Sequence, residues 1–187
     1  YENIEKLSPL EEILWYDYQR SINNAPVLNT EDHIAVNNSK IYGDEISQFM
    51  IQAIWEGALH GRAFSHIWLW ERHDGSNKSQ TFRGNSSYRP DVVAGTGRTT
   101  HDLNRLSYEV VAIQEEKADV AILYSDAAAM HTREFGNMMR HTYVGTVYAG
   151  KKVQFVTEDQ MYKLADCKAL IIPRVLNAKS ETVDAIY

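Results

Sequence analysis

The stretch that decides the fold is PVLNTEDH at residues 26–33. Its first part, Pro26 to Thr30, predicts a short buried strand that follows a pair of asparagines. Glu31 then stands at the carboxyl end of this strand, just before a polar segment that extends to Gly43. In a (β/α)8 barrel, catalytic side chains project from the carboxyl ends of the strands. Glu31 is therefore the first candidate for a catalytic residue.

Helical and strand patterns alternate on both sides of this stretch. Ser8 as a cap, Pro9 at the first helical position and Glu11 predict a helix that ends at Asn23-Asn24. After residue 43, apolar spacing predicts a helix over 44–62, a buried strand over 63–70 and a helix from Thr99 or Thr100 to about 116. The polar segment 71–98 shows no periodicity and is expected to be a long loop, which a compact domain keeps mainly for function.

A second pattern of strands and helices begins at Ala118. Strands are expected over 119–124, 152–156 and 169–172, with helices over 133–148 and 157–165 and a last helix capped by Ser180. Strands that alternate with helices imply right-handed crossovers and a parallel sheet. The pattern stops about two turns into the last helix, so we expect both ends of the chain to be cuts in a longer protein.

Composition excludes some partners and leaves the compartment open. The 187 residues are 44% hydrophobic and 24% charged with a net charge of −6, so a folded protein is expected and nucleic acid is not an expected partner. No apolar run approaches the ~20 residues that span a bilayer, so no membrane is expected. Cys167 is the single cysteine, and the chain opens without Met or a signal pattern. The N-terminus is expected to be missing, and cytoplasm and periplasm both remain possible.

The residues around Glu31 suit a sugar. Three of the four tryptophans lie between Trp55 and Trp70, and an indole stacks on the apolar face of a pyranose. Glycoside hydrolysis needs two carboxyl groups, which lie ~5–5.5 Å apart in a retaining enzyme. Two simpler interpretations stay open at this point, because a glutamate after a strand is often a solvated loop residue and clustered tryptophans are often core packing.

Other reactive residues predict no further site. His60, His66 and His73 lack the spacing of a metal-ligand set, so neither a metal nor another cofactor is expected. Cys167 precedes a strand and is interpreted as structural. Gly95 and Gly97 follow no strand and do not indicate a nucleotide site.

The order PVLNTEDH, IWEGALHG, FSHIWLWER resembles the end of a clan A glycoside hydrolase barrel, and is most similar to the glycoside hydrolase family 42 group of β-galactosidases. The resemblance implies that Glu31 is the catalytic nucleophile and that Trp68 or Trp70 lines the sugar subsite. His33 and Glu71 become candidate partners of sugar hydroxyls, although Glu71 is expected slightly more to pair with its neighbour Arg72. The partner acid of this clan comes from an Asn-Glu pair after the fourth strand, which this sequence lacks.

The segments ADVAILYSD, KVQFVTEDQ and CKALIIPRVLNAKSETVDAI resemble the start of the trimerisation domain of those β-galactosidases, which is flavodoxin-like. The predicted organisation is thus the C-terminal portion of a (β/α)8 barrel over 1–117, followed by a truncated flavodoxin-like domain over 118–187. The predicted function is a retaining hydrolase of β-galactosides or related β-glycosides, working as a homo-oligomer. The alternative is a non-catalytic flavodoxin-like oligomerisation module.

Overall fold

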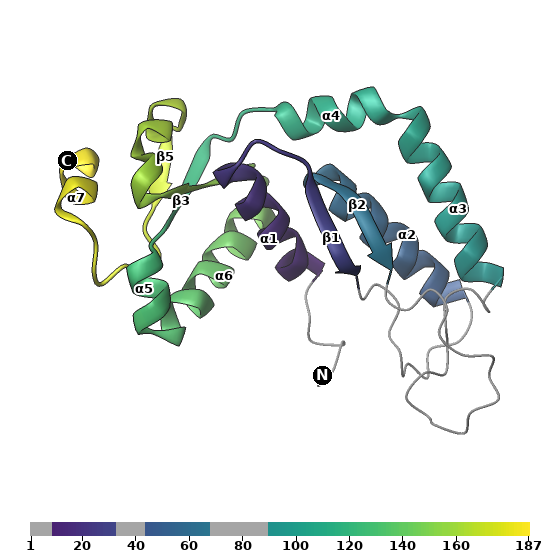
Figure 1. Cartoon of the computed structure of the whole chain (residues 1–187), viewed down its shortest axis with the longest axis horizontal. Coiled ribbons are helices and arrows are strands. Elements are labelled where there is room, and N and C mark those ends of the chain that lie inside the picture. The colour runs from purple at the N-terminus through teal and green to yellow at the C-terminus, as the bar shows by residue number, and fades with distance from the viewer. Residues whose placement is uncertain (1–8, 33–43, 68–89) are drawn as a thin grey trace, which may run out of the picture. The chain divides into compact units, whose positions relative to one another are not determined.

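The computed structural model describes residues 9–32, 44–67 and 90–187, which divide into two compact units (Figure 1). The first unit contains 26–115, and the second contains Leu10–Ala25 and Glu116–Tyr187. Both units are mixed α/β structures with parallel strands, as the sequence predicts. None of the helices in the described ranges is long and apolar enough to cross a membrane.

In the first unit, a two-stranded parallel sheet packs with the helix that connects its strands and with the helices that follow it in the chain. Its elements are β1 (Val27–Asp32), α2 (Asp44–Leu59), β2 (Arg62–Ile67), α3 (Pro90–Arg105) and α4 (Ser107–Glu115). Met50 and Ile54 of α2 and Val92 of α3 form the buried core of this unit, and Ile67 of β2 packs against them. The strand–helix–strand order fits the βαβ unit expected from the sequence.

The prediction of a long loop over 71–98 is wrong for its last nine residues, because α3 begins at Pro90. The buried positions of α3 are Val92, Gly95 and Thr99, and only the first of them is apolar, so hydrophobic periodicity could not reveal the helix. A Cβ at Gly95 would lie 2.5 Å from Oγ of Ser47, so this glycine lets α3 approach α2 closely. Ser47 Oγ also donates a hydrogen bond to the carbonyl of Asp91 at 2.8 Å.

Smaller departures from the sequence expectations concern helix ends. The expected helix to residue 116 is interrupted at Leu106, which separates α3 from α4. The last helix is capped by Lys179, not Ser180, which is its first helical residue. The expected helix over 157–165 is a 3-10 segment, η4 (Glu158–Asp166), with non-helical backbone at Gln160. The expected cap Ser8 and the segments 33–43 and 68–89 lie outside the described residues.

The second unit is built on a three-stranded parallel sheet in the order β4 (Val153–Thr157), β3 (Val120–Tyr124), β5 (Ala169–Ile171). Doubly wound sheets of the flavodoxin type begin with this strand order, second-first-third in the chain. Buried Ile122, Leu123, Phe155 and Val156 form the centre of the sheet. The elements are α1 (Pro9–Ile22), β3 (Val120–Tyr124), α5 (Asp126–His131), α6 (Arg133–Tyr148), β4 (Val153–Thr157), η4, β5 (Ala169–Ile171) and α7 (Ser180–Ile186).

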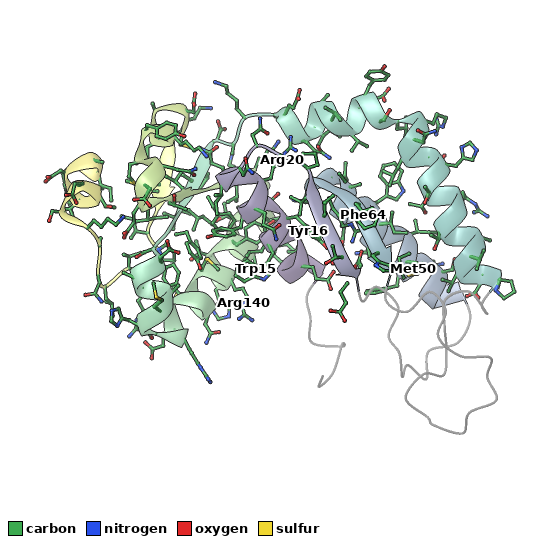
Figure 2. The ribbon with its side chains drawn as sticks, viewed as in Figure 1. Trp15, Tyr16, Arg20, Met50, Phe64 and Arg140 are labelled. Carbon is green, nitrogen blue, oxygen red and sulfur yellow. The ribbon has the colours of Figure 1, made fainter. Side chains whose placement is uncertain are left out.

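Helix α1 precedes β1 in the chain but packs in the second unit. Phe155 of β4 contacts Tyr18 of α1 with ring centroids 5.5 Å apart and Tyr143 of α6 at 5.9 Å. Both helices therefore cover the same face of the sheet. Figure 2 labels Trp15, Tyr16 and Arg20 on α1 and Arg140 on α6.

The carboxyl end of α1 also covers the edge strand β4. The backbone N–H of Phe155 donates to Oγ of Ser21 at 2.9 Å. Lys163 Nζ donates to the carbonyl of Ser21, and Gln160 Nε2 to that of Ile22 at 2.9 Å. An edge N–H that would otherwise face outward is thus satisfied, which protects the edge from pairing with another chain.

One hydrogen bond ties α1 to α6. Tyr143 Oη donates to Oδ2 of Asp17 at 2.6 Å, and the tyrosine is fully buried. Burial, and next the negative charge of Asp17, raise the pKa of Tyr143 well above its usual range. The phenol therefore stays protonated as the donor to the carboxylate across the ordinary pH range.

Tyr143→Phe is expected to lower the free energy of unfolding by about 1.5–3 kcal/mol, because the carboxylate of Asp17 loses a charge-assisted hydrogen bond. The measurement is the urea midpoint followed by circular dichroism. Tyr148→Phe on the exposed end of the same helix is the matched control and should leave the midpoint unchanged. Equal midpoints for the two variants would contradict the importance of this bond.

Candidate functional site

The carboxyl ends of β1 and β2 form the candidate site. The two strands are parallel, with Val27 opposite Arg62 and Asp32 opposite Ile67. The carboxyl ends of the two strands therefore lie at the same end of the sheet, as in the barrel arrangement expected from the sequence.

Glu31 lies within β1 and is exposed. The register between the strands shifts between Asn29 and Asp32, which marks a β-bulge or similar irregularity beside Glu31. Asn29 Oδ1 accepts a hydrogen bond from the Glu31 N–H at 3.1 Å, so the asparagine side chain supports the backbone at this point. Irregularities of this kind often re-aim a side chain next to an active site.

Asp32 is buried where Glu31 is exposed, so neighbouring carboxylates have opposite surroundings. The side chain of Asp32 is 1% exposed, and its Oδ2 accepts from Nη1 of Arg62 at 2.6 Å. Ser65 Oγ donates to the same oxygen. The side chain of Asp32 therefore faces inward, while that of Glu31 is exposed.

Arg62 joins β1, β2 and α2. Its side chain is 3% exposed, and its Nη2 donates to the carbonyls of Ala53 at 2.9 Å and Ile54 at 3.4 Å. A Cβ at Gly57 of α2 would overlap the guanidinium, at 2.6 Å from Nη2. The glycine therefore leaves the space that the buried cation occupies. We call Asp32, Arg62 and Ser65 the Arg62 network.

Two large apolar side chains mark the face opposite α2. Leu28 and Phe64 are register partners and are 61% and 50% exposed. Ile67 packs toward the core of α2 and α3, so strand alternation puts Phe64 on the other face, where Figure 2 labels it on β2. The two strands thus expose Glu31 near the carboxyl end of β1 and an apolar pair farther back.

The remaining predicted site residues cannot be placed. His33, Trp68, Trp70 and Glu71 lie outside the described residues, as does Arg72. Of the predicted set the structure therefore locates Glu31. Within 9–32, 44–67 and 90–187, no three His, Cys, Asp or Glu side chains gather as a possible metal site.

Sequence reasoning missed the Arg62 network. Arg62 introduces the predicted strand in GRAFSHI, where an arginine among small and apolar residues was an available signal. Charged residues in such positions are rarely buried unless they are paired. Its partner could not be found from spacing, because Asp32 is thirty positions earlier in the chain and belongs to another strand.

Comparison with solved structures finds the same fold in larger proteins. The exo-carrageenase GH42 from Bacteroides ovatus matches 94% of this chain with a TM-score of 0.80 and 20% identity. Gan42B, a GH42 β-galactosidase from G. stearothermophilus, matches 95% with a TM-score of 0.69 and 18% identity. The β-galactosidase from the haloarchaeon Halorubrum lacusprofundi matches 96% with a TM-score of 0.66 and 16% identity.

The chain has the fold of one segment of these three larger structures. This chain spans 24%, 28% and 28% of the lengths of those three structures. No family model matches the sequence, and no curated protein matches it. At these identities the likeness establishes the fold, and the resemblance noted in the sequence agrees with it.

Cys167 lies in the second unit and has the surroundings of a structural thiol. It is partly buried, and its Sγ accepts a hydrogen bond from Nε2 of Gln154 at 2.8 Å. Burial raises the pKa of Cys167 above its usual value, which the hydrogen bond from Gln154 partly opposes. A raised pKa lowers the fraction of reactive thiolate at neutral pH.

Cys167 is therefore expected to react with iodoacetamide at pH 7.5 several-fold more slowly than free glutathione, because less of it is thiolate. Mass spectrometry of the intact chain over time measures the rate. The same chain unfolded in urea is the control and should react as fast as glutathione. A folded chain that reacts faster than glutathione would refute the structural interpretation.

Proposed function

We propose that this chain belongs to a retaining β-glycosidase of the GH42 β-galactosidase type, with Glu31 as its nucleophile. The observation that supports the proposal most is the contrast at the end of β1, where Glu31 is exposed and Asp32 is buried in an ion pair. The fold shared with two β-galactosidases and a carrageenase supports the choice of a carbohydrate substrate.

In the proposed reaction, a carboxylate oxygen of Glu31 attacks the anomeric carbon while the glycosidic C–O bond breaks. A second carboxylic acid, from a part of the enzyme outside this chain, protonates the departing oxygen. The same group then removes a proton from water, which attacks the glycosyl-enzyme and releases the sugar with retained configuration. Trp68, Trp70, His33 and Glu71 are proposed to bind the sugar.

The proposed domains follow from the same assignment. Residues 1–117 would complete a (β/α)8 barrel together with further strands, which would cover the exposed pair Leu28 and Phe64. Residues 118–187 would begin a flavodoxin-like domain of the trimerisation type, consistent with the strand order β4-β3-β5. That domain would assemble the enzyme as a homo-oligomer. Helix α1 lies within 1–117 in the sequence but packs with this second unit.

Glu31→Ala in the complete protein that carries this chain is expected to lower kcat for an aryl β-galactoside by about 10³-fold or more, because the covalent step loses its nucleophile. Sodium azide should restore cleavage and yield a glycosyl azide of inverted configuration, since the small anion occupies the place of the carboxylate.

Glu109→Ala removes an exposed carboxylate from α4 of the same unit and is the matched control, with unchanged kcat expected. Turnover by Glu31→Ala close to that of the unmodified enzyme would refute the nucleophile assignment. If no β-glycoside is cleaved by the unmodified enzyme, the alternative of a non-catalytic oligomerisation module is favoured.

A further inference from the structure

We propose that Arg62 is a positioning residue for the nucleophile, acting through Asp32, and that Gly57 is the spacer that makes this possible. The inference rests on the proposed function of Glu31. Arg62 would not touch the substrate, because its guanidinium is buried among β1, β2 and α2.

The first step of the argument is adjacency. Asp32 follows Glu31 directly, so whatever fixes the side chain of Asp32 fixes the backbone from which Glu31 projects. Asp32 Oδ2 accepts from Arg62 Nη1 and from Ser65 Oγ, and both donors belong to β2. The carboxyl end of β1 is therefore held by side chains of the neighbouring strand.

The second step is that the backbone ladder is irregular at this place. The register shifts between Asn29 and Asp32, so the regular hydrogen-bond pattern does not hold Glu31 in place. Asn29 supports the Glu31 N–H on one side, and the Arg62 network supports Asp32 on the other. The side-chain contacts supply the rigidity that the ladder lacks.

The third step is the anchorage of Arg62 itself. Two donor nitrogens point in different directions, Nη1 to Asp32 and Nη2 to the carbonyls of Ala53 and Ile54 in α2. A planar guanidinium with partners on both sides has one orientation, which a lysine ammonium would not reproduce. Through Arg62, the helix α2 as well as the strand β2 fixes the position of Asp32.

The network matters for catalysis because a nucleophile must be held within a fraction of an ångström of its attack position. A displacement of about 1 Å can cost about 10²-fold in rate. Sites with this accuracy are supported by locked neighbouring groups. Disturbing the Arg62 network should therefore lower kcat more than it changes KM.

The test uses Gly57→Ala in the complete enzyme, because this change keeps every charge and hydrogen-bonding group while its Cβ displaces the guanidinium. Gly97→Ala is the matched control, since Gly97 lies in α3 of the same unit and a Cβ there meets nothing within 4 Å. Ser65→Ala removes one donor to Asp32 and gives a milder second variant. Arg62→Met, Arg62→Lys and Asp32→Asn complete the set.

Rates are expressed per active site, counted by mass spectrometry after covalent labelling with a 2-deoxy-2-fluoro-β-galactosyl inactivator. A merely structural role lowers the number of labelled sites and leaves the rate per site unchanged. We expect Gly57→Ala and Arg62→Met to lower kcat per site by about 10–10²-fold, with KM within about threefold. Ser65→Ala should lower kcat per site by a smaller factor, and Gly97→Ala should leave it unchanged.

The effects of Arg62→Met and Asp32→Asn are expected to be non-additive in the double variant, since both break the same unit. Arg62→Lys keeps the charge and should recover part of kcat. Unchanged kcat per site in Gly57→Ala and Ser65→Ala would overturn the proposal while leaving Glu31 as nucleophile. Activity in Glu31→Ala would instead overturn the proposed function, so the two failures are distinguishable.

Discussion

The first unit depends on the burial of one arginine. Moving a guanidinium and a carboxylate out of water costs several kcal/mol per ion, and the cost is offset when geometry is good and the remaining hydrogen-bonding groups are satisfied. Arg62 meets this requirement with Asp32 and with two carbonyls of α2, while Gly57 provides the room. These contacts link β1, α2 and β2, and losing one partner would leave an unpaired buried charge.

The second unit depends on a helix that comes from an earlier part of the chain. Helix α1 covers one face of the parallel sheet together with α6 and satisfies the edge of β4 through Ser21. Residues 23–26 connect this helix to β1, so the strand that carries Glu31 is attached at its amino end to an element of the second unit. At its carboxyl end the same strand is held by Arg62.

Small side chains decide how the helices of the first unit pack. Gly95 and Ser47 allow α3 to lie close to α2, in contact with a core of Met50, Ile54 and Val92. Close approach and the hydrogen bond between Ser47 and Asp91 stabilise this contact in addition to the burial of apolar area. Contacts made by glycine and serine are not predicted by the hydrophobic pattern of a sequence.

The sequence by itself determined the parallel α/β class, most strands and helices, and the place of Glu31 at the end of a strand, because apolar periodicity and branched residues reflect local burial. It could not reveal the first turns of α3, since only one of the three buried positions of this helix, Val92, is apolar. Only the tertiary structure paired Arg62 with Asp32 and assigned α1 to the sheet of the second unit. Both are contacts between residues far apart in the chain, and no local pattern records which distant partner satisfies a buried charge or covers a sheet face.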